Sequence, residues 1–331
     1  MSSVHSNISV FVPHIGCPNM CSFCNQRYIT GAHLAPHPEE VAAAVNIAKS
    51  SKNYDPKTTE IAFFGGSFTA INRNYMVRLL ETAYEFIKDG SVSGIRLSTR
   101  PDAIDEEILS LLKMYGVTSI ELGAQSLNDR VLKSNNRGHT SKDTFAASKL
   151  IKDYAFSLGI QIMTGLYRDT DENAIKTAKE IIDIIKPDTV RIYPTIVLKD
   201  TALAALYDDK KYTPQTLEEA IDLCAVLYQM FDENGIRVIR TGLHSIEQDA
   251  YIAGPWHPSF SELCQSKIFY NKAISFMKKE GKYNIYVGPL SVSKMVGQGR
   301  SNLIKLKEQG FDCRVLEDEN FKDFQILVER R

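Results

Sequence analysis

Short runs of β-branched and aromatic residues recur along this chain, separated by longer stretches in which apolar residues follow a helical spacing. This alternation is typical of βα units around a parallel sheet. Six units can be counted. The predicted strands are Ile8–Val12, Glu60–Phe64, Gly94–Ser98, Ser119–Leu122, Ile160–Thr164 and Thr189–Tyr193. The predicted helices are Pro38–Ser50, Asn72–Lys88, Ile104–Tyr115, Ser141–Leu158, Asp171–Ile185 and Pro214–Asn234.

Right-handed crossovers between successive parallel strands curl such a sheet into a full or partial barrel, with reactive groups at the carboxyl ends of the strands. We therefore expect an α/β fold, a partial (β/α)6 TIM-like barrel. A further strand-like run, Ile236–Thr241, comes where the barrel pattern stops. Beyond it, the expected elements are a helix at Glu262–Glu280, a strand at Asn284–Val287, a basic helix at Ser301–Gln309 and a final run at Phe324–Val328. These patterns predict a core barrel over residues 1–245 and a small α/β extension over residues 246–331, packed on the barrel.

Composition narrows the functional class. The 331 residues include 39 basic and 40 acidic side chains, a net charge of -1, so no global positive field favours non-specific binding to nucleic acid. An RNA substrate would need a local basic patch. The first residues hold no basic segment followed by an apolar one, and no window reaches the roughly 18 apolar residues of a membrane span. Both features predict a cytoplasmic protein with no membrane partner.

Half of the six cysteines, Cys17, Cys21 and Cys24, fall within eight residues. Thiols so close together make a poor disulfide framework and a good set of soft metal ligands. A zinc site usually has four ligands, and the other three cysteines are isolated. Three thiols packed as small hydrophobic groups are the structural alternative. A 4Fe-4S cluster held by three cysteines would leave one iron open, and we favour this interpretation.

The spacing C-x3-C-x2-C, with Phe23 before the last cysteine, resembles the radical S-adenosylmethionine (SAM) superfamily. The resemblance implies that the three cysteines bind a 4Fe-4S cluster whose open iron is chelated by S-adenosyl-L-methionine. It implies that an electron from the cluster cleaves the sulfonium to a 5'-deoxyadenosyl radical, which abstracts hydrogen from the substrate. It also implies a cofactor contact for Phe23 and a reducing electron donor such as flavodoxin or ferredoxin.

Further motifs follow the predicted strands. Gly65, Gly66 and Ser67 resemble the family's glycine-rich segment, where a missing Cβ lets the backbone approach the methionine amino group. A tight βα turn is the alternative for these glycines. By the same resemblance, Thr99 and Gln125 match positions that contact the ribose or the methionine part of the cofactor.

The resemblance implies that Arg137 contacts the methionine carboxylate of the cofactor, a partner that suits a guanidinium. Gln161 and Met163 match positions near the adenosine, although interior strand residues need no ligand to explain them. For His139 we favour a local hydrogen bond or a helix cap over catalysis. For Glu121 a paired carboxylate is the simpler explanation. No catalytic residue is assigned.

Four segments, STRPD, ELGAQS, NNRGHT and RIYPTIVLKDTALAALY, resemble the catalytic subunit of Elongator and its short bacterial relatives over roughly residues 8–245. In that subunit the radical domain modifies the wobble uridine of tRNA with acetyl-CoA from an acetyltransferase domain. This chain is too short for that domain, and only sixteen residues precede Cys17, so we expect neither it nor the basic RNA-binding region. Tyr167 and Arg168 stand where relatives tend to have proline, and they either shape a different substrate pocket or form an exposed loop pair.

The preferred hypothesis is a radical enzyme that modifies a base of tRNA or rRNA. Basic and aromatic groups that would suit an unpaired base are Arg191, Tyr193, Lys199, Lys294, Arg300, Lys305 and Lys307. The second hypothesis is a radical enzyme for a small molecule or peptide, resembling oxygen-independent coproporphyrinogen oxidase, which the near-neutral charge favours slightly. A non-enzymatic iron-sulfur protein is the third.

Overall fold

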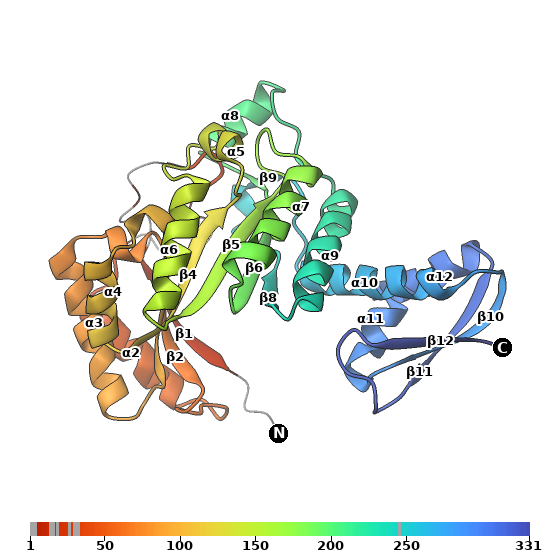
Figure 1. Cartoon of the computed structure of the whole chain (residues 1–331), viewed down its shortest axis with the longest axis horizontal. Coiled ribbons are helices and arrows are strands. Elements are labelled where there is room, and N and C mark those ends of the chain that lie inside the picture. Colours follow the sequence, from red (N-terminus) through yellow and green to blue (C-terminus); the bar gives the residue numbers. More distant parts are fainter. Residues whose placement is uncertain (1–4, 13–16, 18–19, 26–27, 29–33, 244–245) are drawn as a thin grey trace.

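Seven parallel strands form one curled sheet whose strand order follows the chain (Figure 1). The structure is a computed structural model, and it describes residues 5–12, 17, 20–25, 28, 34–243 and 246–331. The strands are β1 (Ser6–Val12), β2 (Thr59–Gly65), β3 (Gly94–Thr99), β4 (Val117–Gln125), β5 (Ser157–Thr164), β6 (Thr189–Pro194) and β8 (Arg237–Thr241). The fold is thus an α/β partial barrel, as predicted. All six counted strands are present, and β8, seen in the sequence as a separate run, joins the sheet beside β6.

Helices between the strands cover the convex face of the sheet (Figure 1). They are α2 (Pro38–Lys49), α3 (Arg73–Lys88), α4 (Glu106–Met114), α6 (Ser141–Asp153), α7 (Asp171–Glu180) and α9 (Leu217–Glu233). Helix α6 ends five residues before the predicted limit at Leu158, because Ala155 adopts a left-handed conformation with φ of 57° and the chain enters β5 at Ser157. The apolar spacing in the sequence continues through Leu158, but Leu158 belongs to strand β5 and not to the helix.

Short elements close the end of the barrel to which the strands point (Figure 1). They are α5 (Asp129–Ser134), α8 (Ala202–Asp208) and the antiparallel pair β7 (Val197–Leu198) and β9 (Tyr251–Ala253). No helix or strand was predicted at these segments, since each is too short to show a period.

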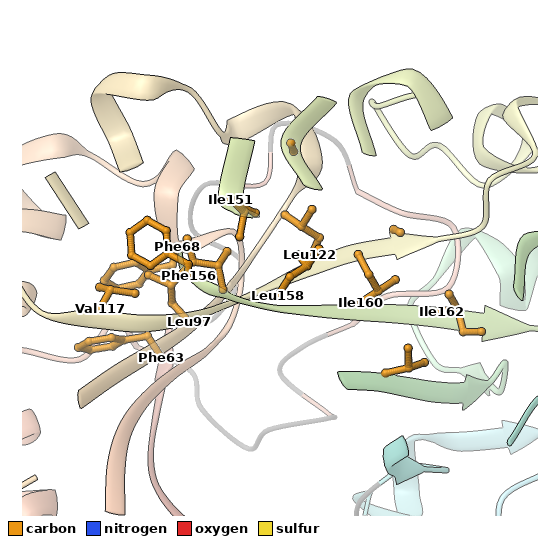
Figure 2. Packing of buried hydrophobic residues seen from close by; sticks show 14 of the residues in the cluster. Phe63, Phe68, Leu97, Val117, Leu122, Ile151, Phe156, Leu158, Ile160 and Ile162 are labelled. Atoms are coloured by element: carbon orange, nitrogen blue, oxygen red, sulfur yellow. The ribbon is translucent and has the colours of Figure 1, made fainter. Parts of the chain in front are cut away.

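The main core lies between the sheet and the covering helices. In Figure 2, Ile151 of α6 lies over Leu122 of β4 and Leu158 of β5, and the rings of Phe63 and Phe68 stack with centroids 4.5 Å apart. Each such side chain contributes roughly 1.5–3 kcal/mol on burial. The other face of each strand is thereby left free to carry polar groups into the barrel interior.

The last part of the chain, residues 260–331, is called the C-terminal unit below, and from Phe269 on its buried residues build a second core. Its sheet has the order β11-β10-β12, with β10 (Gly281–Val287) parallel to β11 (Phe311–Glu317) and antiparallel to β12 (Ile326–Arg330). Helices α10 (Phe260–Phe276), α11 (Val292–Val296) and α12 (Ser301–Glu308) complete it. The small α/β extension is therefore present, and the domain division at 245/246 stays a prediction. Within the described residues, no helix is both long and apolar enough to cross a membrane.

Candidate functional site

The cysteine loop follows β1 at the carboxyl end of the sheet, and contacts from distant segments fix it. Ser22 is the anchor. Its backbone N–H donates to Asn135 O at 3.1 Å and its hydroxyl donates to Asn135 Oδ1 at 2.8 Å, while its own carbonyl accepts Leu203 N–H at 2.7 Å. The loop is thereby tied to the segment after α5 and to the start of α8.

The three thiols interact with one another electrostatically. Burial and then the Cys21 thiol raise the pKa of Cys17, whereas Arg137, Arg100 and the backbone N–H of Ser67 lower it. Burial, Cys21 and Cys17 raise the pKa of Cys24 to about 12. With their pKa values raised in this way, the Cys17 and Cys24 thiols hold their protons near neutral pH, and a metal centre that binds thiolates would displace those protons.

Arg137 links the cysteine loop to the sheet. Its Nη1 donates to Cys21 Sγ at 3.0 Å and its Nη2 donates to the carbonyl of Gly123 in β4 at 2.6 Å. Its Nε is buried and has no hydrogen-bond partner among the described residues. A cation within reach of three sulfurs suits a site that accumulates negative charge.

The glycine-rich segment ends β2 beside this loop. Gly65 has φ of 112°, and a Cβ there would lie 2.8 Å from Val12 O, the same carbonyl that accepts Gly66 N–H at 2.7 Å. The buried hydroxyls of Ser67 and Thr99 lie 2.9 Å apart, and the Ser67 hydroxyl accepts the N–H of Arg100. The ends of β1, β2 and β3 are therefore locked together at this point.

Two glutamines continue the arrangement along β4 and β5. Gln161 Nε2 donates to Gln125 Oε1 at 3.1 Å, and Gln125 holds a left-handed backbone with φ of 65° at the end of its strand. Met163 lies half-buried two residues beyond Gln161, on the same face of β5. Gly123 is the register partner of Gln161, and a Cβ there would lie 3.1 Å from Gln125 Nε2 and 3.5 Å from Arg137 Nη2, so a side chain would crowd both groups.

Phe23 packs in a satellite apolar cluster. Its neighbours there include Val197, Leu203 and Tyr212, all buried, and Tyr167. This packing explains an aromatic residue at the position, and a cofactor contact for Phe23 stays a prediction.

Buried ion pairs occupy the barrel interior below these groups. Glu121 Oε2 lies 2.6 Å from Arg191 Nε in an ion pair, so Glu121 is the paired carboxylate that the sequence analysis favoured. The Arg191 guanidinium lies 5.1 Å from the ring centroid of Phe64, so side chains of β6 and β2 meet across the curled sheet. Tyr193 is also buried. Both side chains thus lie in the barrel interior, and the contact with an RNA base predicted for them stays a prediction.

The remaining basic candidates lie elsewhere. Arg300, Lys305 and Lys307 are exposed on or beside α12, Lys294 is half-exposed in α11, and Lys199 is exposed after β7.

The sequence also could not place Arg168, which stacks over Tyr167 with 5.2 Å between guanidinium carbon and ring centroid. Both line a pocket of about 310 Å³ with Lys211 and Gln215.

Single-ion metal sites are a separate question. Within the described ranges, no three His, Cys, Asp or Glu side chains form a group suited to one metal ion. The cysteines of a four-iron cluster bind different iron atoms, so this finding does not concern a cluster. Three thiols and the Arg137 guanidinium are donors and contacts that fit a 4Fe-4S cluster with its chelating cofactor. The missing Cβ of Gly65 admits the Val12 backbone, the tight-turn alternative, and its contact with a cofactor stays a prediction.

Comparison with known proteins identifies relatives. A family model described as Radical SAM superfamily matches residues 11–181, and a model described as Radical_SAM C-terminal domain matches residues 187–269. The tRNA uridine(34) acetyltransferase of Methanocaldococcus jannaschii is 35% identical over 50% of this chain and 34% of its own length. Elongator complex protein 3 of Homo sapiens is 31% identical over the same shares. The matched segment thus spans about a third of these curated relatives.

Solved structures agree on the fold. Elp3 of Methanocaldococcus infernus with a deleted N-terminus superposes with a TM-score of 0.66 at 22% identity, covering 81% of this chain and 64% of that one. Coproporphyrinogen III oxidase of Escherichia coli, a radical SAM enzyme, gives 0.50 at 17% identity, covering 70% and 53%.

Proposed function

The chain belongs to the radical SAM superfamily and is an enzyme, and on this premise we propose that it modifies a base of RNA, with tRNA as the substrate class. When bound, the 4Fe-4S cluster and S-adenosyl-L-methionine supply the family's 5'-deoxyadenosyl radical chemistry. The relatives named for tRNA uridine(34) and for Elongator support the substrate class. The observation that carries the chemistry is the triad of thiols, with Arg137 bonded both to Cys21 and to the sheet.

The chain's own residues then have distinct tasks. Cys17, Cys21 and Cys24 hold the cluster as thiolates. Arg137 neutralises part of the negative charge and fixes the distance between the cysteine loop and β4.

The groups at the strand ends are assigned to the cofactor. The Gly65–Gly66 turn presents backbone, and the hydroxyl and amide groups of Ser67, Thr99, Gln125 and Gln161 supply hydrogen bonds. Met163 supplies apolar contact near the adenosine. The electron comes from a reductant such as flavodoxin or ferredoxin.

Anaerobic reconstitution tests the chemistry. The native protein should bind iron and sulfide and convert SAM to 5'-deoxyadenosine under reducing conditions. Cys24→Ala should abolish both iron loading and turnover, whereas Cys313→Ala, which removes an isolated half-buried thiol in β11, should change neither. A fully active Cys24→Ala protein would be incompatible with the assigned cluster.

Nucleoside profiling tests the substrate. Mass spectrometry of tRNA and rRNA from a deletion strain and its parent should show one modified nucleoside missing in the deletion. Identical profiles, together with retained SAM cleavage, would favour the small-molecule or peptide alternative.

A further inference from the structure

One row of the barrel interior runs from the candidate cofactor site to the edge of the sheet. Gly123 of β4 is in register with Gln161 of β5, Gln161 with Arg191 of β6, and Arg191 with Arg240 of β8. Residues paired in adjacent parallel strands point to the same face. Arg240 therefore projects into the interior beside Arg191, on the edge strand that bounds the open side of the half-barrel.

The arginines of this interior differ in how their charges are balanced. Arg191 forms an ion pair with Glu121, with 2.6 Å between Nε and Oε2, and Arg96 Nη1 lies 3.6 Å from Glu60 Oε2. Arg240 forms no ion pair within the described part of the chain. Its one hydrogen bond runs from Nε to Gly242 O at 3.2 Å, which leaves both Nη nitrogens free to donate.

This arrangement leaves Arg240 able to take an anion. Arg240 is half-buried, and burial lowers the pKa of its guanidinium; Tyr193 raises that pKa and the charge of Arg191 lowers it. An anion on Arg240 would offset the repulsion from Arg191. The two Nη nitrogens of a guanidinium match two oxygens of a phosphate in a bidentate pair.

We propose that Arg240 binds a backbone phosphate of the RNA substrate and so sets which nucleotide faces the candidate cofactor site. The inference rests on the proposed function, since it assigns the anion to RNA. Arg240 is a specificity residue here, and the neighbouring Tyr193 hydroxyl, which lies 3.3 Å from Arg191 Nη1, completes the polar wall.

The test uses the full-length protein and an anticodon stem-loop RNA with uridine at position 34. Affinity is measured by fluorescence anisotropy over a range of salt concentrations for native protein, Arg240→Gln and Arg237→Gln. Arg237 is the matched control, an exposed arginine at the opposite end of the same strand. Arg240→Gln should weaken binding about tenfold and reduce the slope of log affinity against log salt by about 1, whereas Arg237→Gln should not.

A second arm uses the native protein and RNAs in which single phosphates beside the uridine are replaced by neutral methylphosphonates. At one position the replacement should weaken binding to native protein and have no further effect on Arg240→Gln, since both changes remove the same contact. If Arg240→Gln does not fold, the measurements with native protein still decide. The inference is overturned if no methylphosphonate position weakens binding to the native protein.

A wrong RNA substrate and a wrong role for Arg240 would give different results. Native protein without salt-dependent RNA binding would overturn the proposed RNA substrate and this inference with it. RNA binding that is equal in Arg240→Gln and Arg237→Gln, or independent effects at every phosphate, would overturn the role of Arg240 alone.

Discussion

His139 shows how one buried residue makes stability depend on pH. Its Nε2 lies 3.2 Å from Ala124 O, and because a carbonyl only accepts, Nε2 carries the hydrogen. Its Nδ1 is buried and unpartnered among the described residues. Burial and then the charge of Arg137 lower the pKa of His139 from 6.5 to about 4. The local hydrogen bond is the role we favoured for this residue from the sequence.

The sign of the pH effect follows from that pKa. Between pH 6.5 and 4 the unfolded chain binds a proton on His139 that the folded chain excludes, so stability falls as the pH falls through this window. From pH 7 to pH 5, native protein should lose about 2 kcal/mol more unfolding free energy than His139→Gln, which keeps a donor for Ala124. Urea titrations at both pH values measure this. Equal losses would show that folding does not lower the pKa of His139.

Gly65 is the residue whose substitution should disturb the site most directly. An alanine Cβ would press on Val12 O and displace the end of β1, which leads to the cysteine loop. We expect Gly65→Ala to cost roughly 3 kcal/mol and to lower iron content after reconstitution. Gly90→Ala is the control. Gly90 also has positive φ, 75°, but open space around it, so roughly 1 kcal/mol and normal iron loading are expected. Indistinguishable variants would contradict a role for close approach at Gly65.

At the scale of elements, the sequence predicted what depends on local pattern. The strands before Gly65, Thr99 and Gln125 were placed correctly, because their apolar runs are long and parallel strands bring their carboxyl ends together. The pairing of Glu121 with Arg191 and the packing of Phe23 join segments far apart in the chain. No local period encodes such contacts, which is why the sequence did not identify Arg191 as the partner of Glu121.

The end of α7 carries strain that a substitution should relieve. A π-helical turn, Ile181–Ile185, follows α7 and ends at Lys186, whose backbone is left-handed with φ of 51° and whose N–H donates to Ile181 O at 2.8 Å. Glycine is favoured in this capping conformation. Lys186→Gly should therefore raise the unfolding free energy by roughly 0.5–1 kcal/mol.

Denaturant unfolding of Lys186→Gly and Lys186→Ala measures how much of the change in unfolding free energy comes from the backbone conformation. Alanine removes the lysine side chain but keeps the strained backbone. A stabilisation as large in Lys186→Ala would assign the effect to the side chain instead.

At the scale of the molecule, α10 joins two cores. Phe260 and Cys264 at its start belong to the barrel core, while Phe269 and Ala273 belong to the core of the C-terminal unit. In Figure 1 this helix leads from the barrel to the small sheet. A boundary at 245/246 puts the whole helix in the extension, although its first turns stabilise the barrel.

Substitution of one buried phenylalanine in each core tests whether the two cores unfold separately. Phe231 in α9 and Phe269 in α10 are both fully buried, so each change to alanine should cost roughly 3–5 kcal/mol. If the C-terminal unit unfolds on its own, Phe269→Ala should speed native-state hydrogen exchange in β10, β11 and β12 and leave β2 to β6 protected. Phe231→Ala should speed exchange in the barrel strands. Because Tyr228 of α9 contacts Phe324 of the C-terminal unit, with centroids 5.2 Å apart, the two cores also touch outside α10. A uniform loss of protection in Phe269→Ala would mean that this contact and α10 make the chain one cooperative unit.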